Sequence, residues 1–162
     1  FNTKILKWNE VSGMNIARRF SACSVFEGRI VVSGGYDSSN TVEAYDHVGD
    51  TWENMPNMIN GRFRHKSVAV KNKLFVIGGL STNNCEVFDS NSNKFTFLKH
   101  PSRAYEFELY DPFKVITVGR KIFIFQSNSE VKTYDFENDE WSVKVCEATK
   151  DLMFFSCVKI PV

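Results

Sequence analysis

The stretch Arg29-Ile-Val-Val-Ser-Gly-Gly35 ends a short apolar run in a glycine doublet, and Lys73-Leu-Phe-Val-Ile-Gly-Gly79 repeats this pattern later in the chain. The first glycines of the two doublets, Gly34 and Gly78, stand 44 residues apart. Aromatic residues spaced by seven follow the same repeat, at Phe1 and Trp8, Tyr45 and Trp52, Phe88 and Phe95, and Tyr134 and Trp141. One supersecondary unit has therefore been copied along the chain, and a period of this length is typical of propeller blades or solenoid repeats.

Each unit is predicted to hold four short strands. Its apolar runs are rich in β-branched and aromatic residues and are bounded by turn residues, which is typical of strands. The expected strands are residues 20–26, 29–34, 41–46 and 51–55 in the first unit, and 64–70, 73–78, 84–89 and 94–98 in the second. The second strand of each unit is apolar at consecutive positions, so both of its faces should be buried between stacked sheets. We therefore expect an all-β fold, a β-propeller of four-stranded antiparallel blades.

A third unit is present but degenerate. Lys121-Ile-Phe-Ile-Phe125 aligns with the second strand of the other units, yet Gln126-Ser127 stands where two glycines belong. In the intact units the doublet is predicted to serve packing, because residues without Cβ let the backbone turn sharply and let a neighbouring ring approach. A phosphate-binding loop is rejected, because no helix is expected to follow the doublet.

Composition limits the classes of partner. The 162 residues are 43% hydrophobic and 14% aromatic, which is enough for a substantial core without disulfides. Twenty basic and 19 acidic residues give a net charge of +1, which argues against nucleic acid and anionic membranes as partners. The sequence shows neither a signal peptide nor a run of 18 apolar residues, so we expect no membrane span.

The cysteines and histidines are dispersed along the sequence. No C-x-x-C pair and no metal-ligand spacing occurs, so buried reduced thiols in a cytoplasmic protein are expected rather than a zinc site or a disulfide frame. Isolated histidines are more often structural than metal-binding. We predict no metal and no cofactor. The residues concerned are Cys23, Cys85, Cys146, Cys157, His47, His65 and His100.

The repeated residues resemble the kelch motif. The shared elements are an arginine-led first strand, an apolar strand that ends in Gly-Gly, a Tyr-Asp or Phe-Asp strand, and a later tryptophan and methionine. The matching residues are Arg18, Gly34, Gly35, Tyr45, Trp52, Met55 and Met58 in one copy, and Arg62, Gly78, Gly79 and Phe88 in the next, with Tyr134 and Trp141 continuing the pattern.

The resemblance covers residues 1–98 strongly and 113–145 weakly, and it implies how the chain is divided. Blades are expected at residues 18–58, 62–99 and 113–145, the last of them degenerate. Residues 1–11 would end a preceding blade, and 154–160 would form a closing strand, so the chain would be the C-terminal part of a larger propeller. The alternative is a four-bladed ring in which residues 1–11 and 154–160 together form the fourth blade.

Candidate binding residues should gather at one end of the blades. Loops at the ends of rigid sheets carry recognition in such folds. The expected face combines residues that enter each first strand with the connections between second and third strands, and arginine, tyrosine and small polar side chains suit peptide binding there. The candidates are Arg18, Arg19, Phe20, Tyr36, Asp37, Asn40, Arg62, Arg64, Asn83, Asn84 and Asn128.

Kelch-like relatives give two of these positions a more specific expectation. In that family, arginines fourteen residues before the first glycine of the doublet bind acidic side chains of target peptides. That position is Arg64 in the second full blade but Phe20 in the first. Tyr36, directly after its doublet, is a candidate aromatic contact. The alternatives are that Arg62 and Arg64 are surface residues paired with blade carboxylates and that Tyr36 caps its blade.

The resemblance implies a protein-binding module rather than an enzyme. Some kelch-type propellers are copper-radical oxidases, but the Tyr/His copper cluster that they need is not recognisable here, and no other catalytic constellation stands out. The leading hypothesis is the substrate-recognition propeller of a BTB-BACK-kelch adaptor, which would meet a cullin through a BTB domain absent from this chain. The alternative is a cytoskeletal kelch protein that binds actin.

Overall fold

Three antiparallel sheets of four strands each make up the part of the protein that the structure describes. The computed structural model describes residues 2–37, 40–80, 82, 84–99, 113–126 and 128–150, and within these ranges the side chains of residues 128, 129 and 146–150 are not described. No helix occurs in the described ranges. The predicted all-β fold is confirmed, and the three sheets are blades of a β-propeller.

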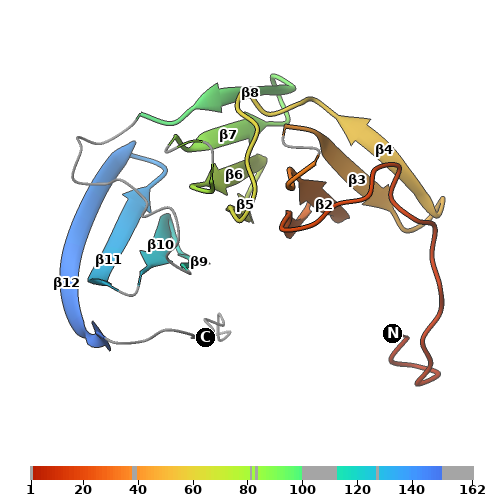
Figure 1. Cartoon of the computed structure of the whole chain (residues 1–162), viewed down its shortest axis with the longest axis horizontal. Coiled ribbons are helices and arrows are strands. Elements are labelled where there is room, and N and C mark those ends of the chain that lie inside the picture. Colours follow the sequence, from red (N-terminus) through yellow and green to blue (C-terminus); the bar gives the residue numbers. More distant parts are fainter. Residues whose placement is uncertain are drawn as a thin grey trace.

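Consecutive strands pair with one another throughout. Blade 1 consists of β1 (Ala22–Phe26), β2 (Arg29–Ser33), β3 (Val42–Asp46) and β4 (Thr51–Met55). Blade 2 consists of β5 (Lys66–Val70), β6 (Lys73–Ile77), β7 (Glu86–Asp89) and β8 (Lys94–Phe97). Blade 3 consists of β9 (Lys114–Val118), β10 (Lys121–Phe125), β11 (Asn128–Asp135) and β12 (Glu140–Lys150). The blades stand side by side along an open arc, with β4, β8 and β12 on its outer side (Figure 1).

The expected strands of the first two units are confirmed to within two residues at each end. The aromatic repeat has a simple structural meaning, because both members of a pair lie directly opposite each other on the third and fourth strands. Their rings contact each other with centroids 4.9 to 5.2 Å apart. The pairs are Tyr45 with Trp52, Phe88 with Phe95, and Tyr134 with Trp141.

The turn at residues 2–7 is a fourth copy of the turn between the third and fourth strands. Asn2 pairs with Lys7 as Asp46 pairs with Thr51 in blade 1. The Asn2 side chain accepts a hydrogen bond from the backbone two residues later, as Asp46 also does. Leu6 takes the left-handed conformation, with a φ of 53°. In a preceding blade this turn would join the third and fourth strands, and that blade stays a prediction. The expected closing strand 154–160 lies outside the described residues.

Two apolar cores hold the blades together. We call the side of a blade that faces the next one its forward face and the opposite side its back face. The forward face of blade 1 packs on the back face of blade 2 through residues such as Phe26, Val31, Leu74 and Phe88. The forward face of blade 2 packs on the back face of blade 3 in the same way. Leu74 to Ile77 of β6 are all buried, so the prediction that this strand is buried on both faces is confirmed.

Blade 3 departs from the sequence-based expectation in one connection. Asn128 was placed in a loop between the second and third strands, but it is the first residue of β11 and pairs with Lys150. The cause is the length of the outer hairpin, since β12 continues to Lys150 and extends the ladder beyond the expected end at residue 145. Asn128 is therefore removed from the loop candidates.

Candidate functional site on the loop face

Arg18 is buried beneath the first glycine doublet. Its guanidinium donates to the carbonyl of Gly34 at 2.8 Å and to that of Thr41 at 3.1 Å. It also forms an ion pair with Glu43 at 2.9 Å, and neither side chain is exposed. The placement of Arg18 on the partner-binding face was therefore wrong, because the loop carbonyls and the carboxylate of its own blade occupy the guanidinium.

Arg62 repeats this arrangement in blade 2. It donates to the carbonyls of Gly78 and Asn84 and forms a buried ion pair with Glu86. Its side chain is not exposed, so it too was wrongly assigned to the partner-binding face. Removing one member of such a pair leaves an uncompensated buried charge, which is strongly unfavourable. The two arginines thus fix the loops, and the residues beside them make the surface.

His65 fills the space that the glycines leave open between blades 1 and 2. A Cβ added to Gly34 would lie 2.7 Å from His65 Cε1, and one added to Gly79 would lie 2.8 Å from the His65 Cβ. The predicted packing role of the doublets is confirmed. The His65 Nε2 atom is hydrogen-bonded to the Ser33 hydroxyl at 2.8 Å. Burial, with a smaller contribution from the Arg62 charge, lowers the pKa of His65 to about 3.

Arg19 and Tyr36 form the first exposed pair above this buried layer. The Arg19 guanidinium lies over the Tyr36 ring, 4.3 Å from its centroid, and pairs with Asp37 at 3.3 Å. The Tyr36 backbone donates to the Arg19 carbonyl at 3.0 Å. Phe63 meets the Tyr36 ring edge to face at 5.1 Å. The loop after β2 is thus bound to the segments that lead into β1 and β5.

Arg64 and Phe20 form the second exposed pair. The Arg64 guanidinium lies 4.8 Å from the centroid of the Phe20 ring, and its backbone donates to the Phe20 carbonyl at 2.8 Å. Both residues have a positive φ, 58° and 59°. This conformation is unfavourable for bulky residues and often marks functional sites. In blades 1 and 2 it occurs two residues before the first strand.

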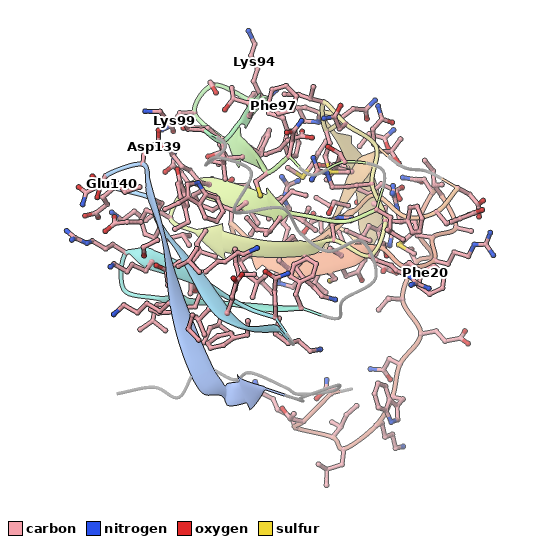
Figure 2. All side chains as sticks on the ribbon, turned by 60° about the vertical axis from the view of Figure 1, so that its left-hand side comes forward. Phe20, Lys94, Phe97, Lys99, Asp139 and Glu140 are labelled. Atoms are coloured by element: carbon pink, nitrogen blue, oxygen red, sulfur yellow. The ribbon has the colours of Figure 1, made fainter. Side chains whose placement is uncertain are left out.

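These side chains form one surface, which we call the loop-face cluster: Arg19, Phe20, Tyr36, Asp37, Phe63 and Arg64. Phe20 and Tyr36 are each 52% exposed. Figure 2 shows Phe20 on the opposite side of the molecule from Asp139, in the turn between β11 and β12, and from Glu140, the first residue of β12. The structure therefore brings five of the predicted candidates together and adds Phe63, which sequence reasoning missed although it occupies the repeat position of Arg19.

The remaining candidates contribute little to this surface. Asn40 and Asn84 are half-buried, and their backbone carbonyls accept hydrogen bonds from the Met58 amide and from the Arg62 guanidinium. Asn83 lies outside the described residues. Asn128 stands in β11, as reported above.

The charges of the cluster are unequal. Arg19 already has a carboxylate partner in Asp37. Among the described residues, Arg64 forms no ion pair and only stacks on Phe20. A guanidinium that contacts an aromatic ring still has N–H donors for a carboxylate, and exposed arginine and aromatic side chains are favoured in protein interfaces. The cluster can therefore contact a peptide by stacking and by charge-assisted hydrogen bonds.

The described part of the chain has neither a cluster of metal-ligating side chains nor a helix able to span a membrane. No group of three His, Cys, Asp or Glu side chains there is placed to hold a metal ion. None of its segments forms a helix with the length and apolar character needed to cross a membrane.

Comparison with known families agrees with this architecture. The family model described as the Kelch motif matches residues 17–59 and 61–102, more than half of the sequence. The chain belongs to the kelch-repeat family.

Individual relatives are distant and much longer. The chain is 28% identical to Kelch-like protein 25 of Xenopus tropicalis over 151 residues, which cover 78% of the chain and 25% of that protein. It is 26% identical to Kelch repeat protein C2 of Vaccinia virus (strain Western Reserve), with 83% of the chain and 28% of that protein covered. It is 37% identical to F-box/kelch-repeat protein At4g39550 of Arabidopsis thaliana over 76 residues, covering 43% and 19%. The chain spans about a quarter of the length of these relatives, which support a kelch protein-binding domain.

Proposed function

We propose that the chain is the substrate-recognition part of a cytoplasmic adaptor for a cullin-RING ubiquitin ligase, and that the loop-face cluster holds the target protein. The observation that carries the proposal is the exposed Arg64 guanidinium, stacked on Phe20 with no carboxylate partner among the described residues. Its place in the repeat is the one at which kelch-like proteins bind acidic peptides. The free thiols of Cys23 and Cys85 suit a cytoplasmic protein.

The mechanism on this proposal is positioning rather than chemistry. The target's acidic side chain would meet the edge of Arg64, and its apolar neighbours would contact Phe20 and Tyr36. The buried Arg18 and Arg62 pairs hold the loops in place, so little conformational freedom is lost when the target binds. A BTB domain outside this chain would recruit the cullin.

Arg64→Ala tests the proposal in the native polypeptide that contains the Arg64-His65-Lys66 sequence. Affinity purification should recover a cullin with both the unaltered protein and the variant, because the ligase contact lies elsewhere. Target proteins should bind the variant about tenfold or more weakly, the loss expected when a central charge-assisted contact of about 1–3 kcal/mol is removed. Lys94→Ala is the matched control, since this exposed basic residue begins β8, far from Phe20 (Figure 2).

Two results would contradict the proposal. Targets that bind the Arg64→Ala variant normally would remove the loop-face cluster from the binding site. Recovery of no cullin, combined with co-sedimentation of the purified protein with actin filaments, would favour the cytoskeletal alternative.

A further inference from the structure

Two lysines begin the inner strands of blades 2 and 3. Lys66 is the first residue of β5 and Lys114 is the first residue of β9, and these strands form the inner edges of neighbouring blades (Figure 1). Blade 1 has Ala22 at the same position. Arg64 of the loop-face cluster precedes Lys66 by two residues, so both lysines stand at the end of the blades that carries this cluster. They add positive charge beside the proposed target-binding surface.

The Lys66 side chain is directed toward blade 3. Its ammonium nitrogen lies 6.0 Å from the centroid of the Phe113 ring, which immediately precedes β9. Phe113 is buried and Lys66 is half-buried. A lysine in such a position covers apolar surface with its methylene groups and keeps its ammonium group near water. Arg64 contacts Phe20 at the entrance to blade 1 instead, so the start of β5 presents one cation toward each neighbouring blade.

The two lysines have no compensating carboxylate. Among the described residues neither Lys66 nor Lys114 forms an ion pair, whereas Arg18 and Arg62 each have a buried glutamate. Burial, with a smaller contribution from the Lys114 charge, lowers the pKa of Lys66. Like charges act on a pKa in this way at short range. The two ammonium groups therefore repel each other, and their placement does not favour the folded chain by itself.

The charge of this pair matches a phosphate group better than a carboxylate. A carboxylate carries one negative charge, whereas the phosphate of a modified side chain carries about −1.5 to −2 near pH 7 and has three strong acceptor oxygens. Lysine commonly binds phosphate as a point charge. A group with almost two negative charges would offset the repulsion between Lys66 and Lys114.

The distance between the two kinds of cation suits a single extended peptide. The two residues from Arg64 to Lys66 span at most about 7 Å of backbone. An extended peptide advances about 3.3 Å per residue, so anionic residues roughly two to four positions apart could meet both cations. One segment of a target that crosses the inner end of blade 2 can therefore contact the loop-face cluster and the lysine pair together.

We propose that Lys66 and Lys114 form a subsite for a phosphorylated residue of the target whose acidic side chain is bound by Arg64. This inference rests on the proposed function and adds a regulation to it, because the target would bind tightly only after phosphorylation. The source of the phosphate would be a modified protein, since the net charge of +1 does not favour nucleic acid as a partner.

Inorganic phosphate is the first probe of the subsite. Thermal unfolding of the purified chain is compared in phosphate and in chloride at pH 7 and equal ionic strength, because a ligand that binds only the folded state raises Tm. Phosphate should raise the Tm of the unaltered chain more than that of Lys66→Met, which keeps most of the side-chain length without the charge. In chloride this variant should be at least as stable as the unaltered chain, because the repulsion is removed.

Lys94→Met is the matched control for this measurement. Lys94 is exposed at the start of β8, far from Phe20 (Figure 2). Phosphate also stabilises folded proteins in general by exclusion from their surface. The control should retain the full gain in Tm, so that only the difference between the two variants reports the subsite. Equal gains in the unaltered chain and in Lys66→Met would overturn the proposal.

Target binding is measured in the native polypeptide that contains these residues. Affinity purification is carried out from lysates with and without phosphatase treatment. Phosphatase should lower the recovery of targets by the unaltered protein about tenfold or more, the loss expected when charge-assisted contacts to a phosphate are removed. A chain that carries both Lys66→Met and Lys114→Met should recover targets at the lower level in either lysate, and Lys94→Met should behave as the unaltered protein does.

The outcomes separate this inference from the proposed function. Loss of targets with Arg64→Ala, together with full recovery by the double lysine variant and after phosphatase treatment, would overturn the phosphate subsite and leave the proposed function intact. Normal recovery with Arg64→Ala would contradict the proposed function and, with it, a target held at both places.

Discussion

Blades 1 and 2 differ from blade 3 in what lies beneath the loop after the second strand. In blade 2 the Gly78 carbonyl accepts a hydrogen bond from Arg62, which is held by the buried Glu86. In blade 3 Gln126 stands at the position of Gly78 and Lys132 at that of Glu86. Both are buried, and the Gln126 amide has no hydrogen-bond partner among the described residues. The strands persist although this polar arrangement has changed.

The glycine doublet and the buried carboxylate therefore form one structural unit. The arginine binds both the glycine carbonyl and the carboxylate in blades 1 and 2. A lysine at the carboxylate position would repel an arginine guanidinium. The carbonyl of the first glycine would then lose its hydrogen-bond donor. Lys132 instead lies 4.0 Å from Glu130. Substitutions of the buried polar groups in blades 1 and 2 should therefore affect stability differently from a substitution in blade 3.

Glu86→Ala should give the largest loss of stability. It would leave the Arg62 guanidinium buried and without its carboxylate, so we expect unfolding to become about 3–5 kcal/mol easier. Glu53→Ala is the matched control, because Glu53 is 63% exposed and pairs with Arg29 on the surface, where such pairs contribute less than about 1 kcal/mol. Urea denaturation followed by circular dichroism measures both, and similar losses would contradict the proposed role of the buried pair.

Gly34→Ala should give the next largest effect. The position has a φ of 61°, which is unfavourable by about 1–2 kcal/mol for a residue with a Cβ. The added methyl would also clash with His65 and with the Arg62 backbone. Gly28→Ala shares the positive φ but meets nothing within 4 Å, so it isolates the conformational effect. The two variants should differ by about 1–3 kcal/mol in the same denaturation experiment; equal losses would exclude the close-packing explanation.

His65 should make the stability of the contact between blades 1 and 2 depend on pH. The contact between blades 2 and 3 should lack this dependence, because Phe113 stands at the equivalent position. Because burial lowers the pKa of His65 to about 3, the unfolded chain binds a proton below about pH 6.5 while the folded chain does not. Stability from this site is therefore complete above pH 6.5 and declines as the pH falls toward 3, by at most about 1.4 kcal/mol per pH unit. Arg62 and Lys66, the charges that act on His65, are cations and act in the same direction.

The His65→Phe variant provides the comparison for this pH dependence. Its unfolding free energy, measured at several pH values, should fall less steeply between pH 6.5 and 4 than that of the unaltered chain. Parallel curves would show that other groups carry the dependence.

Gln126→Met should give the smallest effect and the opposite sign. The amide oxygen and nitrogen of Gln126 are buried with no partner in the described part of the chain, and methionine has a similar length without those polar groups. Stability should rise by about 1 kcal/mol, because an unsatisfied buried group is removed. Thermal unfolding measures the change. A loss of stability would indicate that the amide is satisfied in solution by a bound water.

Much of the fold could be predicted because its signals are local. The apolar second strands and the aromatic pairs depend on spacing within one blade, and Tyr45 and Trp52 lie opposite each other as the repeat indicates. Arg18 and Arg62 were misjudged because their burial depends on a carboxylate about 25 residues away. The glutamate two positions before the aromatic residue of the third strand in blades 1 and 2 was the signal that could have revealed it.

The loop-face cluster was predicted only in part. Arg19 and Tyr36 were identified as surface residues, but their stacking requires two loops from different strands to meet. The left-handed backbone at Phe20 and Arg64 has no signal in these residue types, because bulky side chains disfavour it. Which protein binds the cluster stays a prediction.

The sequential strand order also has a kinetic consequence. Every ladder joins strands that are neighbours in the sequence, so each blade can form from local hairpins before it meets another blade. Contacts of short sequence separation form quickly, whereas docking of preformed blades requires longer loops to be closed. Hydrogen-exchange protection should therefore develop within single blades first. The buried arginines of blades 1 and 2, which bind the segment before each of these blades to the blade itself, would become protected in the final step. Synthesis from the N-terminus would complete the blades one after another.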